Sequence, residues 1–188
     1  RKGASEEDLK QSLQQIGRAS VQATHTVNQL LSLARAEGAG AIDLQSCDME
    51  ALVSEVLNDS LPRAMEKGLD LGYDGVDHQT KRRFLKIQGN PTLLKEMVRN
   101  LVDNAIHYTP STEERMGVIT VRLLVDPYSQ ALAIQVEDNG SGIAAAEKER
   151  IFEPFYRALG SNVDGSGLGL PIVREIAQRH GATVSVDL

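Results

Sequence analysis

The chain has 188 residues, which is enough for one domain of ordinary size with an appendage. Its formal net charge is −6, from 26 acidic and 20 basic residues, which argues against binding to nucleic acid or to an anionic membrane surface. Cys47 is the single cysteine, so an intrachain disulfide is excluded and a reducing, cytosolic environment is expected. The sequence has no apolar run of the roughly 18–20 residues that a membrane helix needs, and no signal-peptide pattern, which predicts a soluble domain without membrane contact.

The first 36 residues are predicted to form one long helix. Ser5 followed by three acidic residues is a typical helix start, with a hydroxyl cap and negative charge near the positive end of the helix dipole. Mainly apolar or small residues then recur at alternating spacings of four and three, as in a heptad repeat: Leu9, Leu13, Ile16, Ser20, Ala23, Val27, Leu30 and Ala34. Such a stripe could pack on its own domain or in a helical bundle shared between subunits. The regularity of the repeat favours the bundle, and therefore a homodimer.

A break in composition with two glycines, at residues 37–48, marks the predicted domain boundary. We therefore assign residues 1–38 to a helical dimerisation segment and residues 39–188 to a globular domain. At the end of the break, Asp48 is expected to cap a second helix that starts at Met49.

The middle of the chain predicts two strands and a third helix. Residues 69–73 and 84–88 alternate between apolar and polar side chains, as strands do. Asn90 followed by Pro91 is a favoured helix start, and this helix should run to about Tyr108.

The remaining elements complete the predicted fold. Residues 118–125 and 131–138 favour two strands joined by a hairpin, and residues 171–180 favour a helix after a glycine-rich stretch. Residues 183–188 alternate like a further strand. This order predicts an α+β fold, a two-layer sandwich with helices on one face of a mixed, mainly antiparallel sheet.

The third predicted helix carries an unusual polar stripe. Glu96, Asn100, Asn104 and His107 stand three or four residues apart, on one face of the helix. Asparagine disfavours a helix interior and gains nothing on a solvated face. The stripe could be arbitrary, or it could be a row of side-chain oxygens that holds a divalent cation carrying phosphates. Mg²⁺ suits this task because it prefers oxygen ligands and keeps several waters.

Two glycine-rich segments follow the third helix. In VEDNGSGI, residues 136–143, Asp138 ends a predicted strand, and its carboxylate can only accept hydrogen bonds, which suits the exocyclic amine of adenine. Taken alone, this segment could be a plain tight turn. In GSGLGL, residues 165–170, glycines before a helix allow close approach of a phosphate to free backbone N–H groups. The spacing is not that of a Rossmann turn, and the lysine of a phosphate-binding P-loop is missing.

The order of these segments resembles the catalytic domains of sensor histidine kinases, within the ATPase superfamily that includes gyrase, MutL and Hsp90. The resemblance covers roughly residues 42–188. The matching segments are EMVRNLVDNAIHYTP (the N box), VEDNGSGI (the first G box), IFEPFYR (the F box) and GSGLGLPIV (the second G box).

The resemblance implies a site for ATP and Mg²⁺. Asn100 and Asn104 would hold magnesium and phosphates as the catalytic pair, and Asp138 would bind the adenine amine. The other nucleotide-binding residues would be His107, Tyr108, Gly140, Gly142, Ile143, Arg157, Gly165, Ser166, Gly167, Leu168, Gly169 and Leu170. Residues 144–164 would form an ATP lid anchored by three aromatic residues, which could equally be ordinary core residues: Phe152, Phe155 and Tyr156.

The resemblance also implies a reaction: ATP-dependent autophosphorylation on histidine, followed by transfer to an Asp in the receiver domain of a response regulator. Hydrolysing relatives carry a glutamate general base four residues before the magnesium asparagine, where this chain has Asn100. Because an amide cannot take a proton from water, slow hydrolysis is expected. An ATP-hydrolysing enzyme, and a nucleotide-binding or dimerisation module without turnover, remain the alternatives.

Two departures from the family pattern bear on this function. None of His25, His78, His107 or His180 is followed by the acidic, aliphatic and basic residues that mark the phosphoacceptor. Residues 5–36 instead resemble the second helix of the dimerisation bundle, so the acceptor is expected before Arg1, and the domain is expected to be truncated at its C-terminus.

The second departure is His107, which replaces the lysine or arginine that often touches phosphate; it could weaken nucleotide binding or only fill the helix end. The resemblance further implies a cytoplasmic domain of a bacterial inner-membrane sensor protein.

Overall fold

The computed structural model describes residues 42–75, 82–126, 128–157 and 165–186, with 10–13, 15–17, 20, 23–24, 26–27, 30–31 and 34 of the N-terminal segment. Every described residue between 10 and 34 is helical, as predicted, whereas Ser5 and Leu9 lie outside the described residues. Along the predicted seam, Leu13, Ile16 and Val27 are exposed. In the part of the chain that is described, no helix combines the length and the apolar character needed to cross a membrane.

The globular part begins with strand β1, Gln45–Asp48, followed directly by helix α2, Met49–Glu66. Asp48 is the N-cap, and its side chain accepts a hydrogen bond from the Ala51 N–H, as the sequence predicted. The strand was missed because only one of its four side chains, that of Cys47, is buried, which is too weak an alternation to recognise.

The next elements follow the prediction with one correction. Strand β2 spans Leu69–Tyr73, and helix α3 spans Pro91–Tyr108 with Asn90 as its cap, both as predicted. The strand predicted at residues 84–88 is partly wrong, because a 3₁₀ helix occupies Arg82–Leu85 and β3 spans Lys86–Gly89.

The C-terminal half contains the predicted hairpin and helix, without the last strand. Strands β4, Gly117–Val125, and β5, Leu132–Asp138, form the hairpin, and α4 spans Gly169–Arg179. Two short 3₁₀ helices, Ala145–Glu147 and Arg150–Phe152, lie between β5 and α4. The prediction of a strand from residue 183 is wrong for the described residues 183–186, which have no regular structure. Alternation of side chains does not make a strand unless a neighbouring strand takes its hydrogen bonds.

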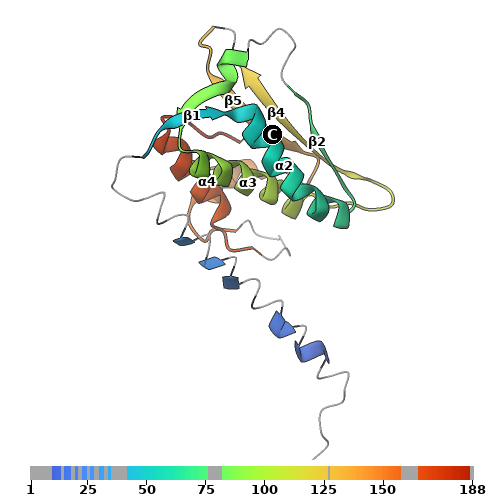
Figure 1. Cartoon of the computed structure of the whole chain (residues 1–188). Helices are drawn as coiled ribbons and strands as arrows, with labels where there is room; N and C mark the ends of the chain where they lie inside the picture. The colour runs from blue at the N-terminus through green and yellow to red at the C-terminus, as the bar shows by residue number, and fades with distance from the viewer. Residues whose placement is uncertain are drawn as a thin grey trace, which may run out of the picture.

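The strands form two hydrogen-bonded sheets and not the single sheet that was expected. Strand β1 pairs with β3 in antiparallel fashion, while β4 lies between β2, which is parallel to it, and β5, which is antiparallel. Helices α2 and α3 pack together beneath the strands, and α4 packs against α3 (Figure 1). The α+β class and the mixed, mainly antiparallel pairing are confirmed.

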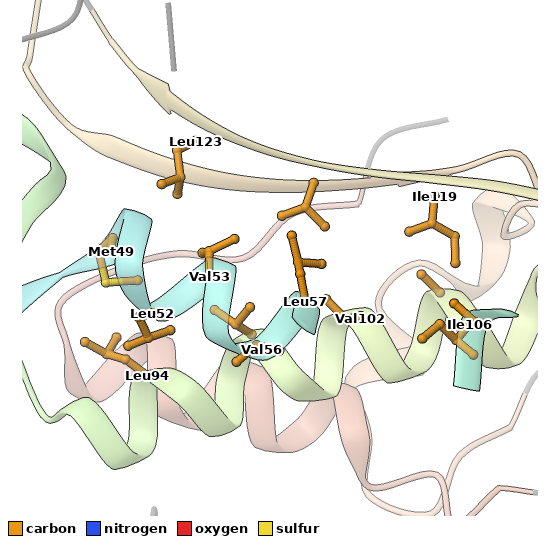
Figure 2. Close-up of a cluster of buried hydrophobic side chains, with 14 of the residues drawn as sticks. Met49, Leu52, Val53, Val56, Leu57, Leu94, Val102, Ile106, Ile119 and Leu123 are labelled. Atoms are coloured by element: carbon orange, nitrogen blue, oxygen red, sulfur yellow. The ribbon is translucent and has the colours of Figure 1, made fainter. Parts of the chain in front are cut away.

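Helix α3 is packed between two hydrophobic clusters, which fixes the position of its polar stripe. On one side, alternate residues of β4, among them Ile119 and Leu123, face buried residues of α2 and α3 such as Val53 and Val102 (Figure 2). On the other side, Leu168, Ile172 and Ile176 form a second cluster against α3. Each fully buried aliphatic side chain contributes about 1.5–3 kcal/mol, so α3 is held firmly on both sides.

Candidate nucleotide-binding site

The side chain of Asn100 is buried on α3 and held in a defined orientation. Its Nδ2 lies 2.9 Å from the backbone oxygen of Glu96 and 3.2 Å from Glu96 Oε1. Both of these atoms can only accept, so the amide nitrogen must face Glu96 and Oδ1 must face away from it. A Cβ added to Gly169, the first residue of α4, would meet Asn100 Oδ1 at 3.4 Å. The amide oxygen therefore lies at the start of α4.

The glycine-rich segment before α4 is packed against the predicted F box. The Phe155 N–H donates to the Gly167 carbonyl at 2.9 Å. Gly167 has φ +71°, and a Cβ there would lie 2.7 Å from the backbone carbon of Phe155 and 2.8 Å from the Tyr156 oxygen. Leu168, the N-cap residue, makes no side-chain cap. Because Pro171 has no N–H, the first turn of α4 can offer an anion the N–H groups of Gly169 and Leu170.

The three predicted lid anchors behave differently. Phe152 is buried, with the Arg174 guanidinium 4.0 Å from its ring centre. The Tyr156 hydroxyl donates to Glu147 Oε1 at 3.1 Å, and desolvation, followed by this hydrogen bond, raises the pKa of the hydroxyl. The side chain of Phe155 is 63% exposed and its φ is +66°, so Phe155 holds the glycine-rich segment through its backbone and not through its ring.

At the end of β5, Asp138 is presented by a tight turn. Its Oδ1 accepts the Gly140 N–H at 2.9 Å, which leaves Oδ2 for another donor. A Cβ at Gly140 would lie 2.6 Å from Asp138 Oδ1 and 2.9 Å from the Tyr108 carbonyl oxygen. Only glycine therefore lets this turn lie against the end of α3. Gly142 has φ +70°, and no atom of the described residues lies within 4 Å of a Cβ built there, so glycine is favoured by the backbone conformation alone.

Sequence reasoning missed Asn139, which fixes the same turn. Its Oδ1 accepts the Val118 N–H at 2.8 Å, and its Nδ2 donates to the Met116 carbonyl at 3.0 Å. Its own backbone N–H donates to the Val118 carbonyl at 3.1 Å. An asparagine before glycine is a common turn signal, which was the available clue, but the partners on β4 cannot be read from the sequence.

The end of α3 meets the glycine-rich segment. His107 and Tyr108 contact each other edge to face, with ring centres 5.1 Å apart. A Cβ at Gly165 would lie 3.7 Å from both His107 Nε2 and the Tyr108 hydroxyl. These residues, the Asp138 turn and the start of α4 thus surround one space.

The predicted site residues line a common open cavity of about 2220 Å³, with one exception. This is larger than the roughly 300–1,000 Å³ of ordinary ligand pockets, because the cavity continues along β5 and residues 182–186. The predicted residues that line it are Asn100, Asn104, His107, Tyr108, Asp138, Gly140, Gly142, Ile143, Arg157, Gly165, Ser166, Gly167, Gly169 and Leu170. The exception is Leu168, whose side chain is buried in the second hydrophobic cluster and whose backbone N–H donates to Ser166 Oγ at 3.2 Å.

The donor set fits a magnesium ion that arrives with phosphates. Among the described residues, no group of three or more His, Cys, Asp and Glu side chains could hold a metal alone. The neutral amide oxygens of Asn100 and Asn104 are suitable ligands for a hard cation that takes its remaining ligands from water and phosphate.

Comparison with known proteins identifies the family. Residues 89–188 match the family described as Histidine kinase-, DNA gyrase B-, and HSP90-like ATPase. The chain belongs to this family. The region that matches the ATPase family contains all the cavity residues assigned from the sequence, whereas β1 and α2 precede it.

Individual relatives extend the match beyond the ATPase region. The chain is 38% identical to the sensor protein QseC of Salmonella typhi over 164 residues, covering 87% of this chain and 33% of QseC. It is 33% identical to the sensor protein kinase PmrB of Pseudomonas aeruginosa over 176 residues, covering 93% of this chain and 34% of PmrB. The chain thus spans about a third of the length of these relatives. The crystal structure of full-length ShkA in complex with AMPPNP aligns with a TM-score of 0.71 and 26% identity, over 95% of this chain and 35% of ShkA.

Proposed function

We propose that this chain is the ATP-binding catalytic part of a protein-histidine kinase of a two-component system. The γ-phosphoryl group of ATP would pass to a histidine and then to an Asp in the receiver domain of a response regulator. The observation that carries the proposal is the arrangement around one cavity of Asp138, the Asn100 amide oxygen and the uncapped start of α4. The relatives named as sensor proteins, and the ShkA complex with AMPPNP, support it.

In this proposal each part of the cavity has one task. The free Oδ2 of Asp138 accepts from the adenine amine, and the first turn of α4 binds the phosphates. Asn100 and Asn104 hold Mg²⁺ against the phosphates. Mg²⁺ held there would supply charge neutralisation on the transferring group, and the residues of the cavity would supply positioning. Because Asn100 is an amide, no general base activates water at this position, which favours transfer over hydrolysis.

The proposal requires an acceptor histidine and a helical bundle that carries it. None of the chain's four histidines is followed by the acceptor pattern, and His25 and His78 lie outside the described residues. We therefore propose that the acceptor belongs to a neighbouring helix of a dimerisation bundle, of which residues 1–38 supply the second helix and residues 39–188 the attached catalytic domain. The exposed Leu13, Ile16 and Val27 would be buried in the homodimer. The parent protein would be a bacterial inner-membrane sensor with this part in the cytoplasm.

The test supplies the acceptor separately. The chain is incubated with γ-labelled Mg-ATP and a helical hairpin that carries an acceptor histidine, with the histidine-to-alanine hairpin as the matched control. The proposal predicts acid-labile label on the hairpin only when its histidine is present. If the chain released phosphate from ATP as fast without any hairpin as with it, it would be an ATPase. If it bound ATP but neither labelled the hairpin nor released phosphate, it would be a module without turnover.

A further inference from the structure

The buried amide of Asn100 donates to two acceptor oxygens of Glu96, one from the backbone and one from the side chain. We propose that Glu96 is a positioning residue of the nucleotide site. Its carboxylate holds the Asn100 amide so that Oδ1 faces the phosphates and metal at the start of α4. The inference rests on the proposed function, because it assigns a role to Glu96 within that same site.

The Glu96 side chain adds a second acceptor for the Asn100 amide to the one that the Glu96 backbone supplies. Glu96 precedes Asn100 by one helical turn, and both its backbone oxygen and Oε1 accept from Asn100 Nδ2. The backbone oxygen at that position of an α-helix also receives the Asn100 N–H, so it is shared. Rotating the amide by half a turn would lose both side-chain bonds and set Asn100 Oδ1 against two acceptor oxygens. With Asn100 only 6% exposed, water cannot replace those bonds easily.

The neighbouring cations are engaged elsewhere, so the Glu96 carboxylate is available to Asn100. Lys95 pairs with an acid of α2 at 2.5 Å, and Arg99 pairs with another at 2.9 Å. Among the residues that the structure describes, no ion pair involves Glu96. An acid beside a phosphate site repels the ligand, so its presence calls for a compensating role. Orienting Asn100 is such a role.

The role requires an acceptor oxygen and not a charge, which makes it testable. The change Glu96→Gln keeps an acceptor and removes the charge, whereas Glu96→Ala removes both. Titration calorimetry of Mg-ATP into the whole chain should show an affinity about three- to tenfold weaker in Glu96→Ala than in Glu96→Gln, the equivalent of one hydrogen bond, because both variants lack the charge and differ in the acceptor. The matched control is Asp70→Ala, which removes an exposed acid of β2 that does not line the cavity, and it should leave the affinity unchanged.

A double-mutant cycle separates positioning from a direct contact with the ligand. In an Asn100→Ala background, Glu96→Ala should cause no further loss of Mg-ATP affinity, because its effect passes through the amide. Equal weakening in Glu96→Gln and Glu96→Ala, or an additive loss in the double variant, would overturn the inference while leaving ATP binding intact. A folded chain that binds no nucleotide at all would overturn the proposed function instead, and this inference with it. Circular dichroism of each variant reports whether it has folded.

Discussion

Replacing Gly167 by alanine tests the contact between the glycine-rich segment and residues 155–156. Gly167 and Gly142 have almost the same backbone conformation, with φ +71° and +70°. Their surroundings differ. A Cβ at Gly167 would lie 2.7–2.8 Å from backbone atoms of Phe155 and Tyr156, whereas no atom of the described part of the chain lies within 4 Å of one at Gly142. The pair therefore separates the cost of conformation from the cost of crowding.

The expected magnitudes follow from those two terms. A left-handed backbone conformation costs an L-residue roughly 1–2 kcal/mol, and both variants bear this cost. Forcing extra atoms into a packed site costs roughly 1–3 kcal/mol more, and Gly167→Ala alone bears it because backbone atoms cannot rotate away. We expect Gly167→Ala to lose about 2–5 kcal/mol of unfolding free energy and Gly142→Ala about 1–2 kcal/mol.

Urea denaturation measures the difference, with thermal unfolding as a second reading at about 2–4 °C per kcal/mol for a chain of this size. Gly181→Ala is a further control, since Gly181 also has a positive φ, +68°, in open space. Equal losses in Gly167→Ala and Gly142→Ala would mean that the segment does not pack against residues 155–156 as described.

Three further changes test other parts of the structure. Asn139→Ala should lose about 1–3 kcal/mol of unfolding free energy in urea, because it leaves the Val118 N–H and the Met116 carbonyl without their partner. Leu94→Ala should cost about 2–5 kcal/mol in the same assay, because Leu94 is buried in the main cluster. Hydrogen bonds from Ser129, and secondarily from the Tyr128 N–H, lower the pKa of Asp126. The stability that this carboxylate contributes is therefore fully present above its unfolded pKa of about 3.9 and is lost as the pH falls through the lower folded pKa. An NMR titration of the Asp126 carboxyl carbon should show that lowered midpoint, and an ordinary midpoint would contradict the turn geometry.

The sequence predicted the elements whose signals are strong and local. Helix α3 combines a cap at Asn90, a first-turn proline and a clear apolar face, so its limits agreed with the structure. Strand β1 was missed because it has four residues and one buried side chain, and residues 183–186 were overpredicted because strand formation depends on a partner that alternation does not reveal.

For the candidate site, the sequence indicated the segments that line the cavity but not the contacts between their atoms. Motif order indicated which segments would meet, and they line one cavity. Asn139 acts through a hydrogen bond to the neighbouring strand, and Glu96 through a hydrogen bond along one helical turn. Residue spacing does not reveal which atoms form such bonds. Leu168 was assigned to the nucleotide site because it lies in a glycine-rich motif, but its side chain is part of the core between α3 and α4.

The central claim is that this cavity binds Mg-ATP through Asp138 and the asparagines of α3. Its most direct test is calorimetric titration of Mg-ATP into the unmodified chain and into Asp138→Ala and Asn104→Ala, with Asp126→Asn as a control at the far hairpin. We predict binding at one site that is retained in the control and lost in both site variants. Absence of binding to the folded, unmodified chain at up to about 1 mM nucleotide, or undiminished binding in the two site variants, would contradict the claim.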